Sequence, residues 1–263
     1  MKFKPLLFIL IALFSQQAVA QVLVGPVVGG NYSWAAFANK DLKDTYKTGG
    51  VFGFHAGGQL SFRVKKRFFL HTQLVYSTKG RTLKSNYEQQ FSFSARYNFI
   101  EMPIVYSIDF KVKTNNSREF KYFLGVGPNI SYWLGGKGSI SDGNLKENNI
   151  DKLDYKIAFK SADEPQADNE MVVTEPNRFQ LGLNIAAGLV FEPADRQRVM
   201  LTLRYELGHT NLAKSTGTVN QTYFQDPLQS RNQGFRVSIA YLYDLKTADR
   251  NRGKSTIDKR KPK

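Results

Sequence analysis

The sequence predicts an all-β protein, an eight-stranded antiparallel up-and-down transmembrane β-barrel. Eight stretches alternate apolar residues with small, polar or charged ones at period two, the spacing at which strand side chains change faces. The connections between these stretches alternate short and long, as in outer-membrane barrels. The chain has 20 Phe and 13 Tyr although only 41% of its residues are hydrophobic, which suits a wall that is apolar on one face and carries aromatic girdles.

The first twenty residues have the features of a secretory signal peptide. Lys2 and Lys4 precede an apolar stretch at residues 6–14, and Ala18-Val19-Ala20 form a small-residue cleavage site before Gln21. This stretch is too short to cross a bilayer as a helix, and no later stretch approaches the ~20 apolar residues required. We therefore expect a signal peptide at 1–20, a barrel at 21–246, a basic periplasmic tail at 247–263, and localisation in the cell outer membrane.

The eight alternating stretches are the expected strands, and the second shows the pattern most clearly. There Phe52, Phe54 and Leu60 fall on one face, while His55 and Gln59 fall on the other. Most of the stretches are long enough for the ~9–11 residues that a tilted strand needs to cross a bilayer. In chain order the strands are expected at residues 22–34, 51–64, 68–78, 100–110, 120–134, 179–191, 199–207 and 235–243.

Three connections are short and four are long. The short ones lie at residues 65–67, 112–118 and 193–195, and the long ones at 35–50, 79–94, 135–176 and 212–232. An even strand number puts both chain ends on one side, with short turns periplasmic and long loops extracellular. A soluble β-sandwich or lipocalin-like barrel also has alternating strands, but it would point its apolar face inward. Here the opposite face holds Gly, Ser, Asn, Gln and charged residues, a poor dry core.

Five stretches resemble the PorT-like outer-membrane β-barrel family of Bacteroidetes. They are Gly25-Pro26-Val27-Val28-Gly29-Gly30-Asn31-Tyr32-Ser33, Phe99-Ile100-Glu101-Met102-Pro103-Ile104, Gly125-Val126-Gly127-Pro128, Arg204-Tyr205-Glu206-Leu207-Gly208-His209-Thr210-Asn211-Leu212 and Gly234-Phe235-Arg236-Val237-Ser238-Ile239-Ala240-Tyr241-Leu242. The resemblance implies an outer-membrane barrel that the barrel-assembly machinery inserts. The founding member of the family is linked to type IX secretion. Many outer-membrane barrels end at a terminal aromatic residue of the last strand, and the basic tail departs from this pattern. The assembly signal is therefore expected to be internal, ending near Tyr243.

The inward-facing charges predict a filled lumen. An eight-stranded barrel is just wide enough for side chains to fill its interior, and buried charges need partners. We expect a structural network of ion pairs centred on Glu101, Arg204, Glu206 and Arg236; a proton or ion path is the alternative. The full inward set balances four positive and four negative residues: Arg63, Glu101, Asp109, Lys121, Arg204, Glu206, Arg236 and Asp244.

Catalytic and metal sites are not expected. Hydrolytic chemistry on lipids needs a Ser nucleophile with a His base or a close equivalent, and the sequence around His55, His71 and His209 does not supply one. The acidic loop at residues 135–176 lacks the ligand spacing of an EF-hand. We expect this loop to be solvated and mobile, with calcium binding as the alternative. No cysteine is present, and we expect no cofactor.

Positive charge is concentrated on the predicted periplasmic side. The net charge of +15 becomes +13 once Lys2 and Lys4 are removed, whereas residues 135–176 carry −4. The tail has too few apolar residues to fold alone. Expected partners are outer-membrane lipid headgroups and, through the tail, an acidic periplasmic protein or peptidoglycan; nucleic acid is not expected. This basic surface comprises Lys65, Lys66, Arg67, Lys111, Lys113, Arg118, Arg250, Arg252, Lys254, Lys259, Arg260, Lys261 and Lys263.

These features favour a non-catalytic outer-membrane barrel with a structural or interaction role at the cell envelope. One alternative is a porin-like channel for passive passage of small solutes. Another, implied by the resemblance alone, is an accessory component of type IX secretion.

Overall fold

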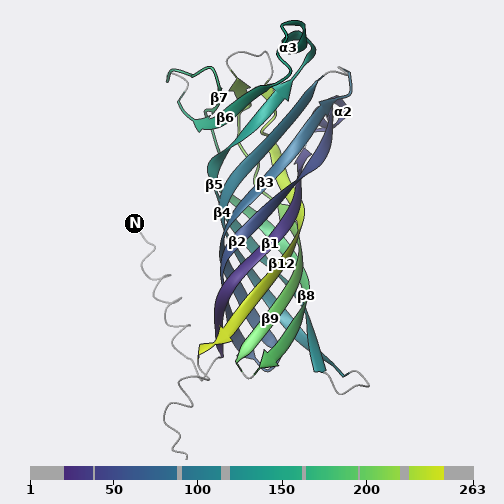
Figure 1. Cartoon of the computed structure of the whole chain (residues 1–263), viewed down its shortest axis with the longest axis vertical. Helices are drawn as coiled ribbons and strands as arrows, with labels where there is room; N and C mark the ends of the chain where they lie inside the picture. Colours follow the sequence, from purple (N-terminus) through teal and green to yellow (C-terminus); the bar gives the residue numbers. More distant parts are fainter. Residues whose placement is uncertain are drawn as a thin grey trace, which may run out of the picture.

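Eight long antiparallel strands form a closed ring in the computed structural model, which describes residues 21–37, 39–87, 91–113, 119–161, 164–194, 196–219 and 225–245 (Figure 1). The ring strands are β1 (Val22–Phe37), β2 (Tyr46–Lys65), β3 (Phe68–Ser85), β4 (Ser92–Lys113), β5 (Glu119–Ser141), β8 (Phe179–Ala194), β9 (Gln197–Gly208) and β12 (Ser230–Asp244). Pairing of β5 with β8 and of β1 with β12 closes the ring. The predicted barrel is therefore confirmed, while the predicted signal peptide and tail lie outside the described residues.

An apolar belt surrounds the outside of the ring. Every ring strand exposes large apolar side chains on its outer face, with Phe52 on β2 as much as 77% exposed. On β4 the outward apolar residues run from Ile100 to Phe110, roughly 33 Å along the strand at a rise of ~3.3 Å per residue. With a tilt of ~40°, that length gives a band about 25 Å high, the height of the apolar band of outer-membrane barrels.

The strands next to the first two long connections continue beyond the belt, so the predicted loop at residues 79–94 is wrong. β3 extends to Ser85 and β4 begins at Ser92. In this part the pattern is inverted: Leu83 and Phe93 are buried inside, whereas Arg96 is exposed outside. Because the prediction followed apolar residues on the outward face, it ended these strands where the belt ends.

The expectation of a solvated mobile loop at residues 135–176 is also wrong. β5 continues to Ser141, β6 (Leu153–Phe159) pairs with β5, and β7 (Glu170–Val173) runs parallel to β6. The remaining small elements are α2 (Lys40–Thr45), α3 (Gly143–Glu147), β10 (Gly217–Val219) and β11 (Gln225–Asp226). Together with the ends of β1 to β5 beyond the belt, the six small elements α2, α3, β6, β7, β10 and β11 form what we call the cap. No helix in the described part of the chain is long and apolar enough to cross a membrane.

An aromatic core holds the cap on the barrel. Trp133 of β5 is fully buried, and its ring contacts Tyr97 of β4 at 5.5 Å and Phe159 of β6 at 4.8 Å between centroids. Met171 of β7 and Leu228 are buried in the same cluster. The cap lies at the end of the barrel opposite the starting residues of β1 and the last residues of β12 (Figure 1). Both described chain ends therefore lie at the end with the short turns.

Candidate functional site

Four buried charged residues form a closed circuit of ion pairs inside the barrel. Lys79 of β3 bridges the carboxylates of Glu101 of β4 and Glu206 of β9. Arg236 of β12 bridges the same two carboxylates, with 2.9 Å between its Nη2 and Glu206 Oε2. Each residue thus contacts two residues of opposite charge, and the four charges cancel. We call these four residues the ion-pair ring.

The strand order makes two of the four pairs span the lumen. In the ring of eight strands, β3 lies opposite β9 and β4 lies opposite β12. The Lys79–Glu206 and Glu101–Arg236 pairs therefore join opposite walls, whereas the other two pairs join neighbours. A buried carboxylate or cation is stable only when a group of opposite charge is within hydrogen-bonding distance. The two pairs that cross the lumen supply such partners from the opposite wall.

Polar side chains complete the surroundings of the ion-pair ring. Asn129 Nδ2 donates to Glu206 Oε1 at 3.0 Å, and Ser131 Oγ donates to Glu101 Oε1 at 3.2 Å. Arg204 adds a positive charge beside the ring and donates from Nη1 to Gln73 Oε1 at 3.2 Å. A cavity of about 20 Å³ lies beside Arg204, space for about one water molecule. The lumen at this level is filled by side chains.

The structure brings together three of the four residues on which the predicted network was centred. Glu101, Glu206 and Arg236 belong to the ion-pair ring, while Arg204 lies beside it. Lys79 was missed, since it falls in the predicted loop at residues 79–94. Its signal was present in the sequence: Ser77, Lys79 and Leu83 continue the inward positions of β3 at even spacing.

The other four predicted lumen charges do not join this network. Arg63 is exposed at the end with the short turns and donates to Lys66 O at 3.2 Å. Lys121 pairs with Glu192 at 2.7 Å, and Asp244 accepts a hydrogen bond from Gln21. Asp109 is buried near the same end, where its backbone N–H donates to Arg67 O at 2.7 Å. The prediction of a single balanced set of eight is wrong because alternation determines the face of a side chain and not its height.

A second buried ion pair lies in the cap. Arg81 of β3 is fully buried and contacts Asp226 of β11 and Ser230 Oγ, and it donates to Pro227 O at 3.3 Å. Its guanidinium carbon lies 5.8 Å from the ring centroid of Tyr97. Burial raises the pKa of Asp226 to about 6, although the positive charge of Arg81 opposes this shift. The pair attaches the segment around β11 to the barrel wall.

Two histidines form hydrogen bonds with serines inside the barrel. His55 Nε2 lies 2.9 Å from Ser238 Oγ, and His71 contacts Ser61 and Ser107 at 2.8 and 2.9 Å. Sequence spacing could not reveal these pairs, because the serines lie on other strands or far along the chain. All these side chains are buried, and in the described part of the chain the ring nitrogens of the two histidines bond only to serines. Both ring nitrogens of His71 are satisfied in this way, whereas His55 Nδ1 is buried without a hydrogen-bond partner among the described residues. His209 is exposed at the end of β9.

Part of the predicted basic surface can be placed. Lys65, Lys66, Arg67 and Lys111 are exposed at the end with the short turns. The side chain of Lys113, and the residues Arg118, Arg250, Arg252, Lys254, Lys259, Arg260, Lys261 and Lys263, lie outside what the structure describes. Among the described residues, no group of three or more His, Asp or Glu side chains could hold a metal ion. The tail and its partners remain a prediction.

A comparison with protein families matches residues 14–214 to the family described as "Outer membrane protein beta-barrel domain". The chain belongs to this family. In outer-membrane barrels the short turns are periplasmic and the long connections extracellular. This general rule predicts an extracellular cap and periplasmic basic turns for the present barrel.

A comparison with solved structures matches several outer-membrane and surface proteins over most of this chain. Neisserial surface protein A is 13% identical with a TM-score of 0.39, and covers 87% of this chain and 100% of its own. OprG from Pseudomonas aeruginosa is 8% identical with a TM-score of 0.43, covering 87% and 97%. Ail, the attachment invasion locus protein of Yersinia pestis, is 10% identical with a TM-score of 0.35, covering 84% and 98%. A comparison with curated proteins finds no match. The assignment therefore rests on the family match.

Proposed function

We propose that this outer-membrane barrel does not conduct solutes and serves as a structural and interaction protein, which presents its folded cap outside the cell. The observation that carries the proposal is the ion-pair ring. Lys79–Glu206 and Glu101–Arg236 connect opposite walls near the cap-side edge of the belt. A passing solute would have to break both pairs and leave buried charges without partners, which costs several kcal/mol for each ion pair disrupted.

The cap adds a second closure above the ion-pair ring. Trp133, Tyr97 and Phe99 are buried in one cluster, and Leu228 and Val219 from the cap segments pack into it. Such a cluster has the close packing of a protein interior, so a solute would also have to displace side chains here. Two successive closures of different chemistry favour a barrel whose function lies on its surface.

The extracellular cap is the part of this surface best suited to interaction. Its strands β6 and β7 extend the barrel wall, and its inner face is anchored by Tyr155 and Met171. Binding residues are commonly carried by segments that a rigid scaffold positions. A partner would therefore meet a preformed surface, and little conformational entropy would be lost on binding.

Single-channel recording of the refolded mature protein in planar bilayers tests this proposal. The wild-type protein should give no steady conductance steps. A matched variant in which Lys79, Glu101, Glu206 and Arg236 are all replaced by Ser removes the ion-pair ring but leaves the outer face unchanged. Steady steps from the wild-type protein would overturn the proposal and make passive passage of small solutes the working function.

Two finer assignments are supported by the sequence resemblance alone. One is membership of the PorT-like subgroup of Bacteroidetes, and the other is an accessory role in type IX secretion. The motifs around Glu101 and Arg204 support membership of the subgroup. Glu101 also belongs to the ion-pair ring, and Arg204 lies beside this ring. Export by the signal peptide at 1–20 is part of the same proposal.

A further inference from the structure

We propose that a basic groove on the outer wall of the cap binds the phosphorylated sugar headgroup of an outer-leaflet lipid. The inference uses the outer-membrane location of the barrel and is independent of whether the lumen conducts. It concerns Arg96 of β4, Lys137 of β5 and Lys156 of β6, which we call the basic row.

Strand pairing aligns these three cations. Arg96 is paired with Lys137, and Lys137 is paired with Lys156, on three successive strands. Paired residues project from the same face of a sheet, and all three side chains are exposed. The residues that alternate with them, such as Tyr97 and Tyr155, are buried inside. The basic row therefore faces away from the barrel axis.

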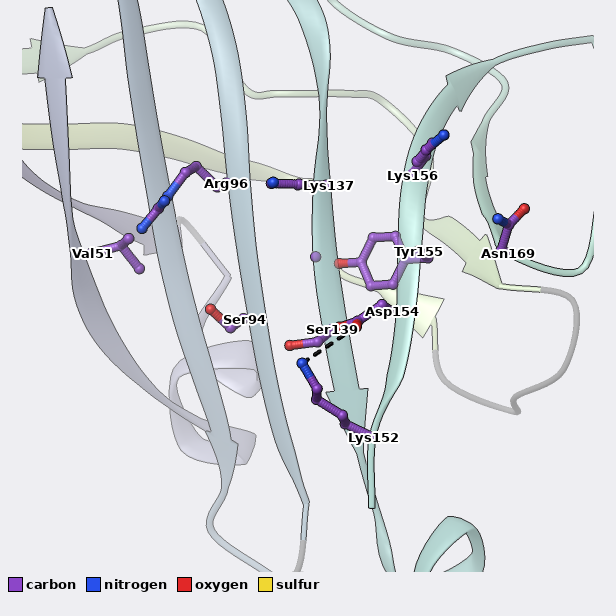
Figure 2. A pocket seen from close by; sticks show the side chains of 11 residues that line it. Val51, Ser94, Arg96, Lys137, Ser139, Lys152, Asp154, Tyr155, Lys156 and Asn169 are labelled. Atoms are coloured by element: carbon purple, nitrogen blue, oxygen red, sulfur yellow. Dashed lines mark ion pairs between the residues drawn. The ribbon is translucent and has the colours of Figure 1, made fainter. Parts of the chain in front are cut away.

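The basic row lines a groove of about 460 Å³ (Figure 2). The small residues Ser94, Gly138 and Ser139 also line it, next to Lys152 and Asp154. In Figure 2, Arg96 and Lys137 lie on neighbouring strands at one level, with Lys156 beyond Tyr155 on the next strand. The volume is sufficient for a phosphorylated sugar, since small-molecule sites have about 300–1,000 Å³. Hydroxyl and backbone groups beside the cations can bond to the sugar.

The cations of the basic row have no carboxylate within ion-pair distance in the described part of the chain. The nearby carboxylates are paired with other lysines: Asp154 with Lys152 at 3.3 Å, and Glu170 with Lys160. Glu170 stands opposite Lys156 in the β6–β7 pairing, without an ion pair between them. Three adjacent like charges repel one another, so an anion between them is favoured. A phosphate monoester can accept several charge-assisted hydrogen bonds.

The height of the basic row favours a lipid over a soluble ligand. Arg96 Nη2 donates to the backbone oxygen of Phe52 at 3.4 Å, and Phe52 is a highly exposed residue at the outer edge of the belt. Lys137 follows the exposed Leu134 by three residues, roughly 10 Å along the strand. The polar headgroup region extends about 5–7 Å beyond each side of the hydrocarbon core. On a tilted strand, the basic row lies near the level of the headgroups and faces them sideways.

Native mass spectrometry of the detergent-solubilised, folded mature protein with lipid A tests the proposal. The test variant is Arg96→Gln/Lys137→Gln/Lys156→Gln. The matched control is Lys43→Gln/Lys47→Gln/Lys84→Gln, which removes the same charge from exposed cap residues that do not line the groove. Bis-phosphorylated lipid A should bind the wild type and the control alike. Its affinity for the test variant should fall on the order of 100-fold, because each cation at an anionic lipid surface contributes roughly fivefold.

Three comparisons decide the ligand class. Lipid A without phosphates should bind the wild type as weakly as bis-phosphorylated lipid A binds the test variant. Equal binding of both lipids to the wild type would overturn the role of phosphate. Inorganic phosphate or glucosamine 1-phosphate should compete only weakly, and competition at the affinity of the lipid would overturn the lipid as the source. Heparin should bind the two triple variants equally; selective loss in the test variant, without loss of lipid A, would assign the groove to a soluble sulfated glycan instead. Heat-modifiable migration on a gel verifies that both variants are folded.

Discussion

Lys79 on β3 and Glu206 on β9 form an ion pair across the lumen although they are 127 positions apart in the chain. Glu101 and Arg236 form the second transverse pair. The four residues therefore connect both halves of the sequence through the interior, in addition to the hydrogen bonds of the wall. Their arrangement has direct consequences for mutagenesis.

Replacing Glu101 by Gln should lower the free energy of unfolding by about 3–5 kcal/mol. Lys79 and Arg236 would keep their charges while losing a shared partner, and an uncompensated buried charge has a cost of that order. The double variant Lys79→Met/Glu206→Gln, which removes one charge of each sign, should cost less than the sum of its two single changes. Urea unfolding of the refolded protein in lipid vesicles measures these differences. Additive single changes would show that the pairs are not energetically coupled.

The stability of the cap should depend on pH through Asp226. Its pKa is about 6 in the folded protein, above the ordinary value of 3.8, because it is buried. The folded protein therefore binds this proton more tightly than the unfolded chain. The contribution to stability is present below about pH 4 and is lost as the pH rises through about 6, by at most about 3 kcal/mol. Asp226→Asn should lack this step, whereas the exposed Asp168→Asn should retain it. Parallel pH curves for wild type and Asp226→Asn would contradict the assignment.

A side chain at Gly188 should not be tolerated well. A Cβ atom there would lie 2.3 Å from Leu201 O and 2.4 Å from the Phe123 ring. Gly188→Ala should therefore destabilise the barrel by about 1–3 kcal/mol through overpacking. At Gly58 a Cβ atom meets nothing within 4 Å, so Gly58→Ala is the matched control and should change stability little. Refolding yield and urea midpoints compare the two, and equal effects would refute the steric explanation.

Trp133 should be essential for an ordered cap. Trp133→Ala removes a fully buried indole, a change that costs about 3–5 kcal/mol in a protein core. Because the ring joins β5 to Phe159 of β6, the loss should fall on the cap. Limited trypsin digestion of vesicle-inserted protein should then cleave near Lys152 and Lys156 faster, while the belt strands stay protected. Tyr87→Ala, at a residue that is 80% exposed, should leave the digestion rate unchanged.

Sequence alternation predicted the membrane-facing part of the fold well. Lipid contact requires apolar residues at every second position, and this requirement applies to each strand by itself, as at Phe52 and Phe54. It also placed His55, Glu101 and Arg236 on the inward face. Local pattern was sufficient for these features because the bilayer imposes the same condition along the whole belt.

The cap and the contacts within the lumen could not be predicted in this way. Beyond the belt, the apolar residues Leu83 and Phe93 face inward and their polar neighbours face outward. The same period of two therefore marks an apolar inner face there, whereas in the belt it marks an apolar outer face. Lys79 and Glu206 meet only because the ring order places their strands opposite each other, and their heights depend on register. Both properties depend on the long-range pairing of strands. The alternating pattern of a single segment does not contain this information.

The transverse ion pairs also bear on the order of barrel assembly. Lys79 and Glu101 are on strands made early, whereas Glu206 and Arg236 are on β9 and β12, and β12 pairs with β1 to close the seam. In an open sheet of the first five strands, Lys79 and Glu101 have only each other as partners from the ion-pair ring. Full pairing of all four charges and closure of the seam then occur in the same step. The closed barrel therefore has a lower electrostatic energy than a half-inserted sheet, in which the charges lack some of their partners.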